Sequence, residues 1–284
     1  MNDKICLVTG ATSGIGKVTA RALAAQGAHV IVVGRNQAKC EETIAEIQAT
    51  TSNQQVEYML ADLSVQADVR RLAEQFYAQH NRLDVLVNNA GNLFRTRKES
   101  ADGIEMTFAL NHLAYFLLTN LLMDALKSAP AARIVSVSSD AHRGQTLDFD
   151  DLEATQKYSA FRVYGQSKLA NVLFTYELAR RLEDMEGAKN ITANALHPGV
   201  VRTNFARSEF TGLLGILLGI ALRFMGIDVE EGAKTSIYLA SSPEVEGVTG
   251  KYFDKQKAVK STAATYDDEM AARLWTVSDE MTNM

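Results

Sequence analysis

Tyr164 and Lys168 lie four residues apart in the stretch Tyr-Gly-Gln-Ser-Lys. On a helix this spacing places the two side chains one turn apart on the same face. An unperturbed phenol has a pKa of about 10, and a nearby ammonium group lowers that pKa because it favours the phenolate. Such a pair can donate or accept a proton near neutral pH. The alternative is an ordinary solvated lysine beside an amphipathic tyrosine, which the spacing alone does not exclude.

The residues that follow Lys168 predict the helix that this pair requires. Apolar side chains recur there at near-helical spacing. Arg180 and Arg181 lie where the negative end of a helix favours cations. The apolar positions are Leu169, Val172, Leu173, Tyr176 and Leu178.

A glycine-rich turn joins the first predicted strand, residues 4–9, to a predicted helix, residues 14–26. Glycine permits a tight turn and a close approach to a ligand. The helix that follows offers unpaired N–H groups and the positive end of its dipole, which suit a pyrophosphate. The spacing is G-x-x-x-G-x-G rather than the commoner G-x-G-x-x-G, and a loop without a ligand is the alternative. The candidate phosphate contacts are Gly10, Thr12, Ser13, Gly14, Ile15 and Gly16.

The residues at the end of the second predicted strand, residues 28–33, favour NADP(H) over NAD(H) as the cofactor. NAD-specific sites usually carry an acid here that bonds the ribose hydroxyl, yet residues 17–40 contain no Asp or Glu. Arg35 can instead pair with a 2′-phosphate through its fork of donors. We therefore predict NADP(H) as the cofactor, with Arg35 and Asn36 near the phosphate. The alternative for Arg35 is an ordinary exposed arginine.

Small or polar residues also follow the third and fourth predicted strands, at the edge where parallel sheets bind ligands. An acid after the third strand can reach the adenine amine, or it can be the N-cap of the next helix. The Asn-Asn-Ala-Gly sequence after the fourth strand lets the backbone approach a ligand, and a plain turn is the alternative. The candidate cofactor contacts are Asp62, Leu63, Asn89, Ala90 and Gly91.

Two further positions are candidates for the proton chemistry. Asn111 lies in a predicted buried helix, where its amide needs a water or a backbone group as partner. Its neighbour His112 has no second metal ligand beside it and is predicted to be structural. Ser138 and Ser139 end the fifth predicted strand, where hydroxyl groups either face the ligand crevice or cap a turn.

The sixth predicted strand is followed by His-Pro-Gly-Val-Val-Arg-Thr at 197–203. Proline fixes this turn, and glycine lets the chain pass close to a ligand. The stretch 205–226 is apolar and dotted with glycines. It either closes over an apolar substrate as a lid, packs on the core or a second subunit, or touches a membrane surface. The candidate cofactor contacts after the strand are Pro198, Gly199, Val201 and Thr203.

The alternation of strands and helices predicts the fold that positions these residues. It indicates a Rossmann-like, doubly wound parallel α/β sheet with helices on both faces, in a single domain over residues 1–284. The tail adds a helix near 229–239, a short strand at 251–253 and a last helix around Leu274 and Trp275. The six main predicted strands are 4–9, 28–33, 56–60, 83–87, 133–137 and 191–196.

Composition limits the class of protein. The 284 residues are 46% hydrophobic and 22% charged, which is typical of soluble globular proteins. A net charge of −5 argues against nucleic-acid binding. Cys6 and Cys40 make no disulfide or metal framework and suit a reducing compartment, so we expect no metal site. The apolar segment 213–227 is too short to span a membrane and no signal-peptide pattern is present, so we expect a cytoplasmic protein.

Together these motifs resemble those of the short-chain dehydrogenase/reductase family from one end of the chain to the other. The chain is most similar to the retinol dehydrogenase-like group, as in Ser-Lys-Leu-Ala-Asn-Val-Leu-Phe at 167–174 and in the long gap from Ser139 to Tyr164. The spacing between serine and tyrosine in that group implies that Ser139, rather than Ser138, is the catalytic serine. The matching elements are residues 9–16, Asp62, residues 88–91, Asn111, Ser139, Tyr164 with Lys168, and Pro198-Gly199 with Thr203.

The resemblance implies hydride transfer between NADP(H) and an apolar aldehyde or ketone, such as a retinoid or lipid-like carbonyl, with its alcohol as the other partner. Tyr164 would exchange the proton, and Lys168 would lower its pKa and bond the nicotinamide ribose. Ser139 would donate a hydrogen bond to the reacting oxygen, and Asn111 would hold a water that links Lys168 to solvent. A dimer or tetramer is expected, since family members pair through the Tyr-bearing helix and the one before it.

Other interpretations stay open at this point. A catalytically silent NADP(H)-binding regulator would keep the glycine turn, and a scaffold would use the 205–226 surface to bind a partner or membrane. Protochlorophyllide reductases are similar in plan, but they usually lack the serine that this chain has at Ser139. The membrane-anchoring N-terminal helix of many animal retinol dehydrogenases has no counterpart in this sequence, so the resemblance does not carry over membrane attachment or retinol itself.

Overall fold

The structure is a computed structural model that describes residues 1–202 and 226–284. Thr203 and all of the 205–226 stretch except its last residue lie outside the described residues. Among the described helices, none combines the length and the apolar character needed to cross a membrane.

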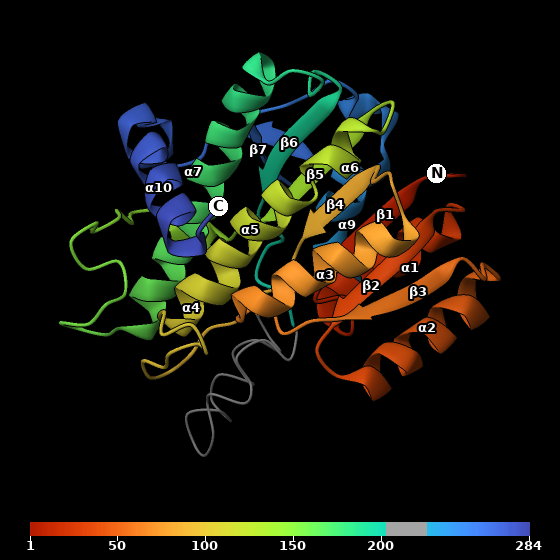
Figure 1. The fold of residues 1–284 in the computed structure, drawn as a ribbon, viewed down its shortest axis with the longest axis horizontal. Coiled ribbons are helices and arrows are strands. Elements are labelled where there is room, and N and C mark those ends of the chain that lie inside the picture. The colour runs from red at the N-terminus through yellow and green to blue at the C-terminus, as the bar shows by residue number, and fades with distance from the viewer. Residues whose placement is uncertain (203–225) are drawn as a thin grey trace.

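The described strands form one sheet in the order β3-β2-β1-β4-β5-β6-β7-β8 (Figure 1). All neighbours pair in parallel except β8, which is antiparallel to β7. This arrangement confirms the predicted doubly wound sheet. The strands are β1 (Ile5–Thr9), β2 (His29–Gly34), β3 (Val56–Leu60), β4 (Val85–Asn88), β5 (Ala132–Val137), β6 (Ile191–Leu196), β7 (Lys251–Asp254) and β8 (Lys257–Val259).

Helices cover both faces of the sheet (Figure 1). The apolar alternation of β1 and β2 directs Val8 and Val32 toward α1, α2 and α9, while Leu7 and Ile31 point toward α3, α5, α6 and α7. The helices are α1 (Gly14–Ala25), α2 (Gln37–Thr51), α3 (Gln66–Gln79), α4 (Met106–Phe108), α5 (Ala114–Leu121), α6 (Met123–Lys127), α7 (Ala160–Asp184), α9 (Val229–Ser241) and α10 (Asp268–Thr282).

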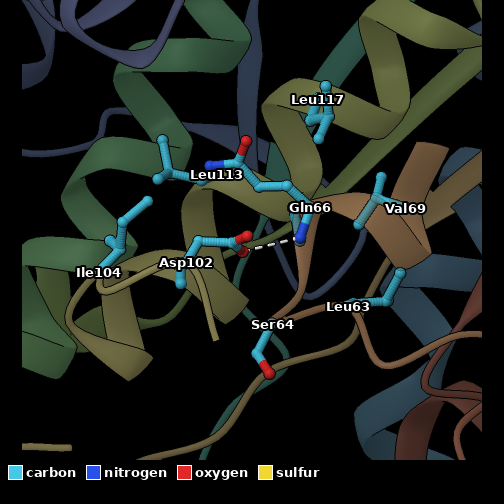
Figure 2. Close-up of a pocket in the computed structure, with 10 residues that line it drawn as sticks. Leu63, Ser64, Gln66, Val69, Asp102, Ile104, Leu113 and Leu117 are labelled. Atoms are coloured by element: carbon cyan, nitrogen blue, oxygen red, sulfur yellow. Dashed lines mark hydrogen bonds between the residues drawn. The ribbon is translucent and has the colours of Figure 1, made fainter. Parts of the chain in front are cut away.

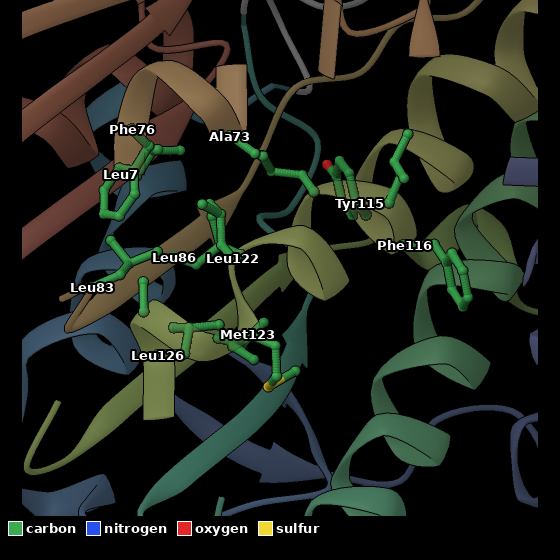
Figure 3. Close-up of a cluster of buried hydrophobic side chains, with 14 of the residues drawn as sticks. Leu7, Ala73, Phe76, Leu83, Leu86, Tyr115, Phe116, Leu122, Met123 and Leu126 are labelled. Carbon is green, nitrogen blue, oxygen red and sulfur yellow. The ribbon is translucent and has the colours of Figure 1, made fainter. Parts of the chain in front are cut away.

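The larger core lies between the sheet and the α3, α5 and α7 layer. Figure 3 shows Leu7 and Leu86 of the sheet close to Phe76 of α3 in this core. Trp275 of α10 stacks on Phe174 of α7, with ring centroids 5.8 Å apart. The C-terminal helix therefore packs against the helix that carries Tyr164 and Lys168.

Two local features differ from the predictions. Residues 109–113 form a π-helical turn, Ala109–Leu113, rather than regular α-helix. The edge strand β8 was not predicted, because its three residues are all exposed and show no apolar pattern. Most of the acidic segment 140–158 is exposed or half-buried, but His142 and Leu147 within it are buried. They are buried because the C-terminal residues around Thr262 pack over this segment.

Candidate active site

Tyr164 and Lys168 lie in the first turns of α7, and their side chains approach each other as their spacing predicts. The Lys168 ammonium nitrogen is 5.7 Å from the centre of the Tyr164 ring. Lys168 is only 3% exposed, and its Nζ donates a hydrogen bond of 3.0 Å to the carbonyl oxygen of Val137 at the end of β5. The strand end therefore fixes the position of the ammonium group.

Ser139, directly after β5, lies against Tyr164. Its hydroxyl hydrogen-bonds the phenol, an interaction that lowers the pKa of Tyr164. The Ser139 Oγ also accepts a hydrogen bond of 3.2 Å from the N–H of Ala141. Ser138 is placed differently, because it is buried and donates to the carbonyl oxygen of Lys168 at 2.7 Å. Only Ser139 of these two serines therefore faces the phenol.

Burial controls the protonation of this pair. Desolvation lowers the pKa of Lys168 to about 7. Burial also raises the pKa of Tyr164 to about 12, and the hydrogen bond from Ser139 offsets only part of that rise. The two causes of the Tyr164 pKa shift are thus burial and the Ser139 hydrogen bond. The lowering of the Tyr164 pKa by Lys168 stays a prediction.

Asn111 occupies the π-helical turn and joins two segments of the site. Its Oδ1 accepts from the N–H of Asn92 at 2.8 Å, and its Nδ2 donates to the carbonyl oxygen of Asn92 at 2.9 Å. Nδ2 also lies 3.0 Å from the Ser167 hydroxyl on α7. A β-carbon added to Gly91 would lie 3.1 Å from Asn111 Oδ1 and 3.4 Å from Lys168 Nζ. Glycine at this position therefore allows the loop after β4 to approach the lysine.

The glycine-rich turn after β1 leaves the start of α1 open. Gly10 and Gly14 have φ angles of 64° and 55°, a region that glycine adopts without strain. Ser13 is the N-cap residue of α1, but its side chain makes no capping hydrogen bond, and the first turn contains no acidic residue. The N–H groups and the positive dipole of this helix end are thus available to an anion.

Asn89 supports this turn from the loop after β4. Its amide Nδ2 donates to the carbonyl oxygen of Thr9 at 2.7 Å. A β-carbon on Gly16 would lie 2.4 Å from the same Nδ2. Gly16 is therefore required by packing of the protein on itself, and the side chain of Asn89 serves the turn. Neighbouring Ala90 is buried beside Gly10.

Arg35, directly after β2, is well placed to meet an anion at the same edge of the sheet. Its side chain is 74% exposed, and its guanidinium lies 3.9 Å from the carboxylate of Asp62, directly after β3. Asn36 beside it caps α2, since its Oδ1 accepts from the N–H of Lys39 at 3.0 Å.

Asp62 does not cap α3, contrary to one of its two predicted roles. The N-cap position of α3 is Val65, and the helix begins at Gln66. Asp62 Oδ1 instead accepts from the N–H and the hydroxyl of Ser64, at 3.0 and 2.7 Å. This closes a separate turn before the helix, because the short side chain reaches only two residues ahead.

Comparison with known proteins settles the family. The model of the short chain dehydrogenase family matches residues 4–213. The chain belongs to the short-chain dehydrogenase family. It is 43% identical to human polyprenol dehydrogenase over 99% of this chain and 86% of that protein. It is also 41% identical to human retinol dehydrogenase 14, over 100% of this chain and 88% of that protein.

Similar solved structures support the same assignment. An uncharacterised protein from Mycobacterium paratuberculosis is 33% identical, with a TM-score of 0.79 over 100% of this chain and 94% of that chain. A short chain dehydrogenase from Shigella flexneri, solved in complex with NADP, is 25% identical, with a TM-score of 0.68 over 90% and 98% of the two chains. The predicted resemblance to the family, and to its retinol dehydrogenase-like group, is thus confirmed.

The loop after β6 brings the remaining predicted contacts of this dehydrogenase to the same edge. Gly199 has a φ of 86°, and its N–H donates to Nδ1 of His197 at 3.1 Å. Pro198 lies between these two residues, and Val201 forms an isolated bridge with Ile227. Thr203 lies outside the described residues.

Two described cavities lie away from Tyr164. The smaller, between α3 and α5, measures about 10 Å³, enough for one water at most. Its lining includes the predicted contact Leu63, and Figure 2 shows Gln66 and Asp102 joined across it by a hydrogen bond of 2.9 Å. The larger, about 400 Å³, opens beside Lys4 and Asp84 at the amino ends of the strands. Neither is lined by a predicted catalytic residue.

Two residues beside the candidate catalytic group are not predicted from the sequence. His142 donates through Nδ1 to the carbonyl oxygen of Ser139 at 2.7 Å and holds that segment against the N–H of Thr262. The ring of Tyr115 lies 5.7 Å from Lys168 Nζ, and its buried hydroxyl has no hydrogen-bond partner among the described residues. Tyr115 follows Asn111 by four residues, a helical spacing that could have signalled a shared face.

Proposed function

We propose that this chain interconverts an apolar aldehyde or ketone and its alcohol by hydride transfer with NADP(H), and that Tyr164 is the general acid and base. Its family makes it an oxidoreductase of alcohol and carbonyl groups. The observation that carries the finer proposal is the grouping of Ser139, Tyr164 and Lys168 at the carboxyl edge of the sheet. These groups supply a proton donor, a hydrogen-bond donor and a cation within one small volume.

NADP(H) suits the residues at this edge. The uncapped N-terminus of α1 offers N–H groups to a pyrophosphate, and the exposed Arg35 offers a fork of donors to a 2′-phosphate. The Shigella flexneri dehydrogenase was solved with NADP, and a related Pseudomonas aeruginosa protein, RhlG, was also solved in an NADP complex. The cofactor would supply the hydride, and the protein would supply position and a proton.

The protein groups divide the work of reduction between them. Tyr164 Oη would give its proton to the carbonyl oxygen as hydride arrives at the carbon. The Ser139 hydroxyl would donate a hydrogen bond to the same oxygen, where negative charge develops. Lys168, partly protonated at pH 7, would favour the resulting phenolate. Asn111 would hold a water through which Lys168 regains a proton from solvent.

The apolar substrate is supported by the surface near Tyr164. Phe161 lies one turn before Tyr164 on α7 and is 65% exposed, and Val200 in the loop after β6 is 58% exposed. Large apolar side chains exposed at a ligand-binding edge suit an apolar ligand. The named substrates of the human relatives, polyprenol and retinol, are both apolar alcohols.

The test compares Tyr164→Phe with the unchanged chain. NADPH oxidation would be followed with retinal, a polyprenyl aldehyde and a small polar ketone, with NADH as the alternative cofactor. We expect turnover with NADPH on the apolar aldehydes, and a loss of about 10³-fold in Tyr164→Phe. NADPH affinity should stay within about twofold, because the phenol hydroxyl acts on the reacting oxygen.

Tyr176→Phe is the matched control. Tyr176 lies on the same helix, three turns further on, and its hydroxyl bonds Ser261 at 2.9 Å rather than the catalytic group. Full turnover in Tyr164→Phe would refute the assignment of the acid and base. Tight NADPH binding without turnover on any carbonyl would favour the regulator instead.

A further inference from the structure

Two histidines and a glutamate meet at the amino edge of the sheet, opposite the candidate active site. His29 opens β2, Glu57 is the second residue of β3, and His80 directly follows α3. Nε2 of His29 and Nε2 of His80 lie 2.9 and 2.7 Å from the same carboxylate oxygen, Oε1 of Glu57. These three atoms all lie within 4.8 Å of one another.

The three side chains are held before any ligand arrives. The His29 and His80 rings contact edge to face, with centroids 5.1 Å apart, and His80 also packs on Phe76 at 5.2 Å. The side chains are partly buried, with exposed fractions of 28% for His29, 31% for Glu57 and 10% for His80. Among the described residues, no lysine or arginine forms an ion pair with Glu57. Within the described part of the chain, the ion-pair partners of Glu57 are therefore the two imidazole groups.

We propose that His29, Glu57 and His80 form a binding site for a zinc ion, with water as the fourth ligand. Two imidazole nitrogens and one carboxylate oxygen are a common ligand set for zinc, at about 2.0–2.2 Å from the metal. Two ligands of a tetrahedral ion then lie about 3.3 Å apart. The present nitrogen–oxygen separations need to widen by about 0.5 Å. The two imidazole nitrogens, which lie within 4.8 Å of each other, need to reach the same separation of about 3.3 Å.

The position of the site indicates a structural role. Hydride transfer is proposed at the carboxyl ends of the strands, whereas His29 and Glu57 lie at the amino ends of β2 and β3. A bound ion would connect the C-terminal end of α3 to two strands at one side of the sheet. It would stabilise the folded chain by binding the native state and not the unfolded one. The spacing of the ligands, 29, 57 and 80, follows no zinc motif, because each comes from a different element.

The test uses the full chain without a histidine tag, stripped with a chelator and then returned to chelator-free buffer. Zinc chloride is titrated by calorimetry, with magnesium chloride as the second ion. We expect one zinc ion per chain, no heat from magnesium, and a rise in Tm of about 5 °C at saturating zinc.

Three single variants, His29→Asn, Glu57→Gln and His80→Asn, identify the ligands. Each should weaken zinc binding at least about tenfold and abolish most of the rise in Tm. Glu41→Gln is the matched control, since Glu41 is an exposed glutamate that bonds Gln37 and Tyr58 instead. Circular dichroism establishes that each variant is folded.

Two results would overturn the proposal. The first is an unchanged chain that binds no zinc. The second is zinc binding that persists at full affinity in folded Glu57→Gln and in a folded histidine variant, because the ion would then lie elsewhere. The three variants change different elements of the fold. If one of them does not fold, the zinc affinities of the other two still test the proposal.

Discussion

Two groups of titratable side chains, at opposite edges of one sheet, are governed by opposite forces. At the carboxyl edge, desolvation dominates: it lowers the pKa of Lys168 to about 7 and raises that of Tyr164 to about 12. At the amino edge, mutual hydrogen bonding dominates, because the bond from His29 is the largest influence on Glu57 and holds its pKa below the usual value.

The two edges show that one sheet can hold ionisable groups for proton transfer at one end and ionisable groups that stabilise the fold at the other. Burial pushes both groups toward their neutral forms, which keeps the proton on Tyr164 and lets Lys168 exchange one near pH 7. A carboxylate that accepts hydrogen bonds, as Glu57 does, stays ionised to lower pH and strengthens the fold, or binds a cation. Removing a charge should therefore have opposite effects on stability at the two edges.

The largest expected effect is that of Lys168→Met. Turnover should fall about 10²- to 10⁴-fold, because the phenolate loses its cation. The free energy of unfolding should nevertheless rise by about 2 kcal/mol, since methionine needs no hydration. Steady-state kinetics and urea unfolding measure the two effects.

The pH dependence of that stability gain sharpens the comparison. Lys168 has a folded pKa of about 7, below its ordinary value of 10.5, so between these values the unfolded chain binds the extra proton more readily. The gain in Lys168→Met should be greatest below about pH 7 and vanish near pH 10.5. Lys189→Met, which removes an exposed lysine, should show no such trend. If the Lys168→Met variant were less stable than the unchanged chain at every pH, burial of the Lys168 ammonium group would not be a source of instability.

A smaller effect is expected from Arg35→Asp, at the carboxyl end of the strand that begins with His29. NADPH affinity should fall about 10- to 100-fold, because a charge-assisted pair with the 2′-phosphate becomes a repulsion. NADH affinity should change little. Arg35→Lys should lose less, since it keeps the charge without the fork of donors. Fluorescence titration measures both cofactors, and equal affinities for them in every variant would refute the assignment of Arg35.

The smallest effect is expected from Glu57→Gln in chelator-treated protein. Glu57 has a lowered folded pKa, so its contribution to stability is present above its unfolded pKa and is lost as the pH falls through the folded value. Because the side chain is about one-third exposed, the loss should be only about 0.5–1 kcal/mol at about pH 6. Urea midpoints for the variant and the unchanged chain should converge below about pH 4. A constant difference across this range would mean that packing, and not charge, is lost.

Much of the fold could be predicted because apolar runs alternate with helical patterns. The strands from β1 to β7 were anticipated in this way, with β4 shifted by two residues at its start. The pairing of β8 could not be foreseen, because Lys257, Ala258 and Val259 are all exposed and depend on β7 for their hydrogen bonds. The π-helical turn could not be predicted either, because its residues show the same apolar pattern as an ordinary α-helix.

The candidate site was partly predictable, because residue spacing along a helix determines which side chains share a face. The spacing of Tyr164 and Lys168 anticipates their approach, but the direction of the Tyr164 pKa depends on burial, which only the packed structure gives. The hydrogen bond from His142 to the carbonyl oxygen of Ser139 depends on a short turn, Asp140–His142, which no sequence pattern predicts. The catalytic roles, the predicted dimer or tetramer and the cytoplasmic location stay predictions.

The π-helical turn Ala109–Leu113 makes the length of this segment matter as much as its composition. A π-helical turn holds one residue more than an α-helical one, so deletion of a single residue there would restore a regular helix. One full turn would then replace another, so α5 would keep its orientation about the helix axis relative to α4. The loss would fall on the turn itself, where Asn111 bonds both the N–H and the carbonyl oxygen of Asn92. Removing one residue should therefore disturb the loop after β4 more than the helix that follows the turn.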